Sequence, residues 1–444
     1  MTADTGLGDL LDGNDVAGLQ QWLADHPPHV VADELARADE VTAVFCFRLL
    51  AKDRAVEVFE ELDAVDQQKI LEGLRDQTFR HVVEEMDPDD RARLLGEAPA
   101  NFAQRVLAGL SSRERALTAP LLGYEQDAVG RYMSPELVLL KERSTVAEAL
   151  DRVRRVGPDA ETVYTLPVVD DRRHLVGVAS LREVVLAPPA RPLIELVDTE
   201  FPRVYATDNA ETAARLMQEA NLLGLPVVDS EERVVGILTV DDAIELIEEA
   251  DTEDVARQAG AEPVEGHYLS VGVFRLARAR IIWLFLLILA ATLTAGVLQA
   301  FEGELAEVTA LAVFIPLLVG TGGNVGAQAA TAAVRAIAVG ELRTGDVARV
   351  AWRECRVGFL LGVGLGVVGM VLATVMTDGR IAVTVSLSLV LICSWAAVVG
   401  SAMPLLARQL GIDPAVISAP LVTTLVDATG LVIYFLIARA VLGL

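Results

Sequence analysis

The stretch Ile417–Ala438 reads ISAPLVTTLVDATGLVIYFLIA and carries a single acid, Asp427, in the middle of an otherwise apolar run. About 20 mostly apolar residues are enough to cross a bilayer as a helix. A carboxylate near the bilayer centre costs roughly 2.5–3.5 kcal/mol on insertion scales, so it is normally found facing a partner or a water-filled path. At helical spacing one face carries the polar and small residues Pro420, Thr423, Thr424, Asp427, Gly430 and Tyr434. We predict a functional acid on a polar stripe; the alternative is a structural acid paired with an arginine of another helix.

The charge of the chain separates an acidic part from a mostly apolar part. Residues 274–444 carry 11 Lys or Arg and 9 Asp or Glu, a net charge of +2. Residues 1–273 therefore hold 26 and 54, a net charge of −28. An acidic surface repels nucleic acid and attracts cations. We expect no nucleic-acid partner, and we interpret the surplus as a demand for counterions, with solubility alone as the other explanation.

The cysteines and the N-terminus indicate a cytosolic start to the chain. Cys46, Cys355 and Cys393 have no paired spacing, which argues against a zinc site or a disulfide framework and fits a reducing compartment. The first residues are polar and acidic, so no signal peptide is expected. The sequence also lacks a GxxxxGK[ST] phosphate loop. We expect a protein that is not an enzyme.

Two soluble regions precede the apolar part. Residues 1–130 show recurring amphipathic stretches separated by polar starts such as AVDQQ, DPDDR and SSRER, which predict helix N-caps in an all-α superhelical array. Residues 131–250 contain a pattern twice, with TLPVVD and HLVGVAS followed about 60 residues later by GLPVVD and RVVGILT. Each copy reads as helix, strand, turn, strand and helix, which is an internal repeat.

This repeat resembles a pair of CBS domains, at 131–196 and 197–254. Such pairs commonly bind adenine nucleotides, with an acid three residues after a Ser or Thr on the ribose. The matching positions are Thr239 with Asp242 and Ser180 with Glu183, the glutamate being a departure from the pattern. The resemblance implies ATP as a regulatory ligand, and a pure dimerisation module is the alternative. The nucleotide candidates are Ser180, Arg182, Glu183, Thr239 and Asp242.

An acidic run follows the second copy, with eight acids and no base between Asp241 and Asp254. Acids one helical turn apart repel one another and destabilise a helix. A divalent cation would remove that repulsion, whereas a solvated acidic face is the plainer interpretation. The run leads into a predicted connecting helix at 255–280, immediately before the apolar part.

Five membrane spans are predicted in residues 281–444, an all-α domain. They are Ile281–Phe301, Ala310–Val339, Gly358–Met376, Ile381–Leu405 and Val416–Leu442. The positive-inside rule places the arginines before the first span, and the Arg-rich loop after the second, in the cytoplasm. The N-terminus is then cytoplasmic and the C-terminus extracytoplasmic, in a multi-pass protein of the cell (inner) membrane.

The second span contains PLLVGTGGNVGAQAATAAVRA, Pro316–Ala336. Its glycines permit close helix approach or a local break. Asn324, Gln328 and Thr331 follow at roughly one-turn spacing and end at Arg335. A face of small and amide residues is typical of a pore wall or of a tight helix interface, and the spacing favours neither.

These segments together resemble the MgtE family of magnesium channels. The GGN segment of the second span, the GIDP loop, the acid-bearing PLVTTLVDATGLVIYF and the order of the domains carry the resemblance over essentially the whole chain. One departure is Ala327, where the family often has a second amide.

The resemblance implies a homodimer in the lipid bilayer, with a pore between the second and fifth spans and Mg²⁺ as the permeating ion. Mg²⁺ keeps its waters and is held by one or two carboxylates, which suits two symmetry-related Asp427 side chains. It also implies that cytoplasmic acids bind Mg²⁺ and close the pore. The pore candidates are Gly323, Asn324, Thr331, Thr423, Thr424 and Asp427. The sensor candidates are Asp90, Glu211, Asp241, Asp242, Glu245, Glu248, Glu249, Asp251, Glu253, Asp254 and Asp413.

Two other classes remain open. One is an ion-coupled secondary transporter of Mg²⁺, Mn²⁺ or Co²⁺, which would normally need a further intramembrane acid or an inverted repeat. The other is a nucleotide-sensing CBS membrane receptor whose spans only dimerise, which would leave Asp427 without a role.

Overall fold

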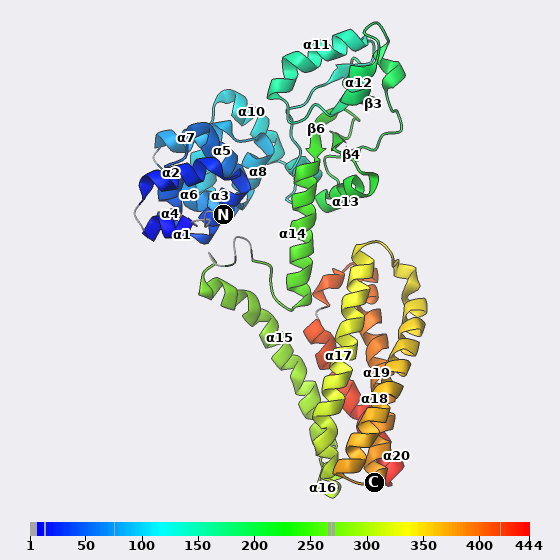
Figure 1. Ribbon diagram of the computed structural model, residues 1–444. Helices are drawn as coiled ribbons and strands as arrows, with labels where there is room; N and C mark the ends of the chain where they lie inside the picture. Colours follow the sequence, from blue (N-terminus) through cyan, green and yellow to red (C-terminus); the bar gives the residue numbers. More distant parts are fainter. Residues whose placement is uncertain (1–6, 13–14, 75, 265–267, 269–270, 418) are drawn as a thin grey trace, which may run out of the picture. The chain divides into compact units, whose positions relative to one another are not determined.

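The computed structural model describes residues 7–12, 15–74, 76–264, 268, 271–417 and 419–444. The chain forms two compact units, Met1–Ala250 with Glu265–Gly272, and Asp251–Val264 with Val273–Leu444. Figure 1 labels most of the helices of both units and several of the strands.

The first unit begins with short helices packed in series, as the polar starts predict (Figure 1). Several begin at a side chain that caps the helix: Asp15, Asp39 and Ser111 each accept a backbone N–H of the first turn. Their apolar faces form one core that includes Phe47 and Phe59. The helices are α1 (Leu7–Asp12), α2 (Val16–Asp25), α3 (Pro28–Arg37), α4 (Glu40–Phe47), α5 (Lys52–Glu60), α6 (Ala64–Gly73), α7 (Asp76–Glu85), α8 (Pro88–Glu97), α9 (Ala100–Gly109) and α10 (Ser112–Leu121).

The internal repeat folds twice into the same three-stranded sheet. In the first copy a 3-10 turn, η1 (Val129–Arg131), leads to β1 (Leu140–Lys141), α11 (Val146–Val156), η2 (Gly157–Asp159), β2 (Thr165–Val169), β3 (Leu175–Ser180), α12 (Leu181–Leu186) and η3 (Leu193–Leu196). The second has β4 (Val204–Tyr205), α13 (Ala210–Ala220), β5 (Gly224–Val228), β6 (Val234–Thr239) and α14 (Val240–Gln258). Each central strand pairs in parallel with the short first strand and antiparallel with the third. The matched strands confirm the predicted repeat.

The helix of the acidic run differs from the prediction. α14 is continuous from Val240 to Gln258, so the whole run is helical and no boundary falls after residue 254. The next helix, α15, begins at Val273, which means that a single connecting helix over 255–280 is wrong. Leu246 is buried against the second sheet, whereas Ile244 is 59% exposed.

The second unit holds the apolar helices. Among the described residues five helices are long and apolar enough to cross a membrane: α15 (Val273–Ala300), α17 (Ala310–Ala338), α18 (Val347–Met376, preceded by η4, Thr344–Asp346), α19 (Gly379–Gln409) and α20 (Ala419–Leu442). α16 (Glu302–Glu307) and η5 (Pro414–Val416) lie in two connections. The number of spans is as predicted, but α18 begins eleven residues before Gly358 and takes up most of the Arg-rich loop.

Glycines let the membrane helices approach closely, since a side chain at these points would collide with a neighbour. A Cβ on Gly362 of α18 would lie 2.6 Å from the Val390 Cα of α19. A Cβ on Gly322 of α17 would lie 2.6 Å from Ile392 of α19 and 3.2 Å from Val426 of α20. α17, α19 and α20 therefore form one packed group (Figure 1).

Candidate ion-binding sites

The acid of the last span lies against the glycine segment of the second span. A Cβ on Gly323 would be 3.4 Å from Oδ1 of Asp427 and 3.4 Å from the Thr423 side chain. The arginines of these two helices pair with other acids, Arg335 of α17 with Asp251 and Arg439 of α20 with Glu304. Within the described residues Asp427 therefore lies against α17 without an ion pair to an arginine, in contrast to the structural-acid alternative.

The two threonines of the stripe are turned toward their own helix. The hydroxyls of Thr423 and Thr424 donate to the carbonyl oxygen of Pro420 at 2.8 and 2.9 Å. Their oxygens keep lone pairs that can accept a hydrogen bond. The water ligands of a hydrated cation are donors, so these hydroxyls and the Asp427 carboxylate offer acceptors of the kind such an ion needs.

The two faces of α17 have different environments. Gly322, Gly323 and Gly326 are buried against neighbouring helices. Asn324, Gln328 and Thr331 lie on the exposed face of the single chain. The glycine face of α17 therefore forms the tight helix interface. The face with the two amides and Thr331 is exposed in the single chain, where a pore or a second copy of the chain could meet it.

The polar stripe is shorter than helical spacing suggests. Tyr434 follows Asp427 by seven residues, yet it is fully buried in an apolar cluster with Leu311 and Phe435. Its hydroxyl donates to the carbonyl oxygen of Leu311 at 3.0 Å. Tyr434 is therefore a core residue of the membrane unit.

A second group of acids gathers in the first unit, from segments far apart in the sequence. Glu60 ends α5, Asp87 precedes α8, and Asp90 lies in its first turn. One carboxylate oxygen of each of these three residues lies within 4.8 Å of the other two. Carboxylate oxygens are the ligands that Mg²⁺ and Ca²⁺ prefer, so this group has the composition of a hard-cation site.

α14 adjoins this group. We call the three acids, together with Asp89, Glu161, Asp241 and Asp242, the acidic site. Ala92 of α8 and Leu246 of α14 belong to one buried apolar cluster, which brings the first turns of the two helices together. Asp242 accepts a hydrogen bond from the hydroxyl of Thr239. The Asp89 side chain is only 6% exposed, and its Oδ1 has no hydrogen-bond partner.

Burial and mutual repulsion raise the pKa values of Glu60, Asp90, Glu161 and Asp242 in the acidic site. Burial, with the charges of Asp87 and Asp90, raises the pKa of Glu60 to about 8. Burial likewise raises the pKa of Asp242 to about 8, of Glu161 to about 7 and of Asp90 to about 6. A bound cation would remove the cause of the repulsion and favour the ionised forms.

Several predicted sensor acids have arginine partners instead. Glu245 pairs with Arg93, which also lies 3.7 Å from Asp90. Glu211 accepts from Arg215 at 2.7 Å.

In the second unit, Arg257 donates to Glu253 at 2.8 Å and to Asp413 at 2.7 Å. Arg335 lies 3.7 Å from Asp251. Glu248 and Glu249 lie on the exposed side of α14, and Asp254 lies on its last turns. The acidic run is therefore divided: Asp241 and Asp242 belong to the acidic site of the first unit, and the acids from Asp251 onward belong to the second unit.

Sequence reasoning missed Glu60, Asp87, Asp89 and Glu161. The DPDDR segment predicts a helix start, and α8 does begin there, at Pro88. The aspartates of this segment also lie near Glu60 and Glu161, which come from other parts of the chain. Acids clustered at a helix start are common, so only the tertiary structure shows that they converge.

The nucleotide candidates sit where the CBS pattern places them, at the ends of β3 and β6. Ser180 and Thr239 are the last residues of these strands. Arg182 and Glu183 are exposed in α12, while Asp242 is turned into the acidic site. The two copies therefore differ in the surroundings of their acid, in addition to the change from aspartate to glutamate.

Comparison with known proteins matches every region of the chain. Residues 315–437 match the divalent cation transporter model of the MgtE family, 26–127 its intracellular N domain, and 129–189 and 193–249 the CBS domain. The magnesium transporter MgtE of Thermus thermophilus is 40% identical over 98% of both chains. The MgtE of Bacillus subtilis is 29% identical over 88% of this chain and 86% of its own.

A solved structure supports the fold of the soluble part. The cytosolic domain of the Mg²⁺ channel MgtE in complex with ATP matches with a TM-score of 0.51 at 36% identity, covering 54% of this chain and 98% of its own. Identity over the full length, together with the matched domains and the five apolar helices, confirms the resemblance: the chain is a membrane protein that belongs to the MgtE family of magnesium transporters.

Proposed function

We propose that this protein is a homodimeric channel that carries Mg²⁺ into the cell and closes when Mg²⁺ occupies its acidic site. The observation that carries the proposal is the placement of Asp427 against Gly323, on two apolar helices whose own arginines, Arg335 and Arg439, pair with other acids. The relatives named as magnesium transporters support Mg²⁺ as the ion. The relative named as a Mg²⁺ channel supports the channel mechanism.

The driving force for entry is electrical. A divalent ion gains about 4.6 kcal/mol on crossing about 100 mV, twice the value for one charge. Inward flow therefore needs no coupled ion and no ATP hydrolysis. Two copies related by a two-fold axis would face their Asp427 carboxylates and Asn324 amides toward a shared path. Thr423, Thr424 and Thr331 would supply acceptors for the waters of the ion.

The closing step would come from the removal of the repulsion within the acidic site when Mg²⁺ binds. Two like charges about 4 Å apart repel by about 4 kcal/mol at an effective dielectric of about 20. Moving a two-state equilibrium from 1:99 to 99:1 takes about 5.5 kcal/mol, so a few such pairs are enough. Mg²⁺ would reverse the repulsion among Glu60, Asp87, Asp90 and Asp242 and favour the compact, closed form. Because the transported ion is also the sensed ion, the result is negative feedback.

Mg²⁺ binding at the acidic site would be transmitted to the pore along α14, whose first turn belongs to the first unit and whose last turns belong to the second. Its last turns hold Asp413, in the loop before α20, through Arg257. The cytoplasmic side of the membrane then carries the N-terminus, and the odd number of spans leaves the C-terminus outside. ATP at the ends of β3 and β6 would adjust the closure.

Flux measurements on purified protein in liposomes test the proposal. Asp427→Asn keeps the size of the side chain and removes its charge, so Mg²⁺ flux should fall at least tenfold with the dimer intact. Asp346→Asn, an acid at the start of α18 that pairs with Arg349, is the matched control and should keep its flux. Wild-type flux in a folded Asp427→Asn dimer would exclude Asp427 as the pore acid.

A further inference from the structure

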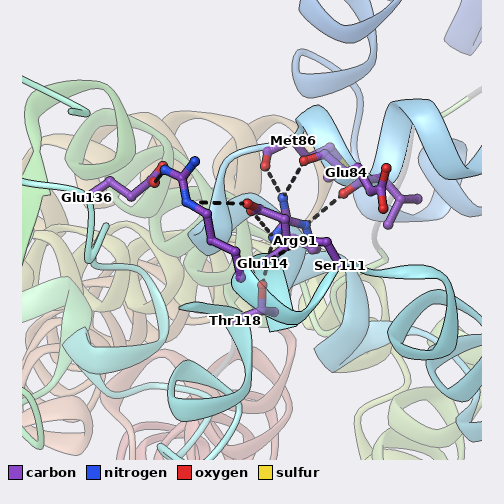
Figure 2. Close-up of polar contacts among 9 residues, drawn as sticks. Glu84, Met86, Arg91, Ser111, Glu114, Thr118 and Glu136 are labelled. Atoms are coloured by element: carbon purple, nitrogen blue, oxygen red, sulfur yellow. Dashed lines mark hydrogen bonds and ion pairs between the residues drawn. The ribbon is translucent and has the colours of Figure 1, made fainter. Parts of the chain in front are cut away.

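Arg91 is a fully buried arginine in the first unit whose hydrogen-bonding capacity is completely used (Figure 2). Its Nε donates to the Val83 carbonyl at 2.8 Å. Nη1 donates to Glu114 at 3.1 Å and to Thr118 at 2.9 Å. Nη2 donates to the Glu84 carbonyl at 3.2 Å and to that of Met86. A guanidinium has five N–H donors, and here each has a partner.

These partners belong to the end of α7 and to α10. The carbonyls of Val83 and Glu84 are among the last ones of α7, which have no acceptor role within the helix, and Met86 is the first residue after it. Glu114 and Thr118 lie one turn apart on α10. The planar guanidinium therefore fixes the end of α7 relative to α10, and with it the turn that leads into α8.

Three members of the acidic site stand on that turn. Asp87 precedes the first residue of α8, and Asp89 and Asp90 follow within its first turn. The backbone N–H of Arg91 donates to the carbonyl of Asp87 at 3.0 Å, so the clamp and the acids share one helical turn. Oδ1 of Asp89 is buried on this turn and accepts no hydrogen bond from any described residue.

Arg91 contributes charge to the acidic site without occupying it. Its positive charge acts on Asp87, opposing the rise in the pKa that burial causes. Its donors, however, are all directed at the α7 carbonyls and α10, away from the carboxylates. The acids are therefore held at fixed spacing, and none of the five donors of Arg91 is bonded to a carboxylate of the acidic site.

The same network extends to the segment that carries Glu161, another member of the acidic site. Arg113 lies 3.9 Å from Glu114 and donates to Glu136 at 2.9 Å. The carbonyl of Glu136 accepts the backbone N–H of Glu161 at 2.8 Å. A chain of contacts thus runs from Arg91 to the segment that carries Glu161.

We propose that Arg91 is a positioning residue for the cation site, which presets the spacing of Asp87, Asp89 and Asp90 so that they bind a divalent ion from a fixed geometry. This inference rests on the proposed role of the acidic site as the Mg²⁺ sensor. Lysine has three donors on a flexible stem and cannot hold five acceptors in one plane. Partners that orient metal ligands typically change metal affinity 10–100-fold when they are lost.

The test uses the full-length protein in detergent, with Mg²⁺ alone as the probe. Two curves are measured against Mg²⁺ concentration: the rise of the unfolding temperature, and the protection of residues 250–275 from protease. Arg91→Lys should raise both Mg²⁺ midpoints about tenfold. Thr118→Val, which removes one acceptor without changing charge, is the milder variant and should move them in the same direction by a smaller factor.

Arg115→Lys is the matched control, because Arg115 also donates to carbonyls at the end of a preceding helix, those of Leu107 and Leu110, but is exposed and fixes the end of α9 in place of α7. Its midpoints should equal those of wild type. In an Asp90→Asn background, Arg91→Lys should have little additional effect, since both changes act on one site.

The outcomes separate the two proposals. If Arg91→Lys and Thr118→Val lower the unfolding temperature in chelator but keep the wild-type Mg²⁺ midpoints, Arg91 only stabilises the fold and the positioning role is wrong. If wild type shows no Mg²⁺-dependent change, or Asp90→Asn leaves it intact, the sensor role itself fails.

Discussion

Gly323 of α17 and Asp427 of α20 face each other so closely that a Cβ on the glycine would lie 3.4 Å from the aspartate Oδ1. Any larger side chain at 323 would occupy the space beside the carboxylate. Asp427 and the glycine segment of α17, which the sequence predicts separately, are therefore in contact. The pairing suggests that the two motifs form one site.

Mg²⁺ flux should fall as the side chain at position 323 becomes larger. Gly323→Ala places its methyl group at ordinary contact distance from Asp427, so Mg²⁺ flux in liposomes should stay within a factor of about two to three. Gly323→Val adds two methyl groups beside the carboxylate and should lower flux about tenfold or more. Gly364→Val is the control, because a Cβ there meets nothing within 4 Å. Equal flux in Gly323→Val and wild type would mean that the ion does not pass Asp427.

The stability of the first unit should depend on pH through the acidic site. In the folded protein Glu60 and Asp242 have a pKa of about 8 and Glu161 of about 7, above their ordinary values. Between about pH 5 and 8 the folded state thus holds protons that the unfolded chain has lost, so stability falls as pH rises. In chelator, the unfolding temperature should drop over this range. Mg²⁺ should lessen the drop, and a pH-independent midpoint in chelator would contradict the assigned burial of these acids.

The ion pair between Arg257 and Asp413 should affect gating more than stability. Both side chains are about one third exposed, and pairs of this kind contribute about 0–1 kcal/mol. Arg257→Gln should therefore leave the unfolding temperature nearly unchanged. It should weaken closure, raising the Mg²⁺ concentration for half-maximal loss of flux several-fold. The control is Arg349→Gln, which removes the exposed partner of Asp346 at the start of α18. Unaltered closure in Arg257→Gln would remove α14 from the gating path.

ATP should bind weakly at the ends of β3 and β6. Thr239 and Asp242 fit the ribose pattern, and a relative's cytosolic domain was solved with ATP. Titrating ATP into the full-length protein should raise the unfolding temperature at millimolar concentration, and Thr239→Val should abolish that rise. Ser180→Val, in the copy with the glutamate, should have a smaller effect. No rise at millimolar ATP in wild type would leave dimerisation as the role of the CBS pair.

The sequence predicted what local patterns determine. The matching LPVVD blocks predict β2 and β5, because a strand and the turn after it are determined by a few neighbouring residues. A carboxylate in an apolar run identifies Asp427 for the same reason. The start of α18 was predicted too late, since the segment between Val347 and Gly358 is charged yet helical.

Convergence in space could not be predicted. Glu60, Asp87 and Glu161 come from three separate elements, and no spacing relates them. Tyr434 shares a helical face with Asp427 but lies in the core because α17 and its own helix pack there. Helical periodicity gives the face of a residue, whereas the neighbours of that face follow from tertiary packing.

The central claim is that Mg²⁺ passes through a pore that cytoplasmic Mg²⁺ closes, and patch recording with Mg²⁺ varied separately on each side tests it most directly. We predict inward Mg²⁺ current at negative voltage without a proton or sodium gradient, which cytoplasmic Mg²⁺ abolishes in wild type. Asp90→Asn combined with Asp242→Asn should keep the current at Mg²⁺ concentrations that close the wild-type channel. A flux that requires a second ion gradient, or a current insensitive to cytoplasmic Mg²⁺, would contradict this account.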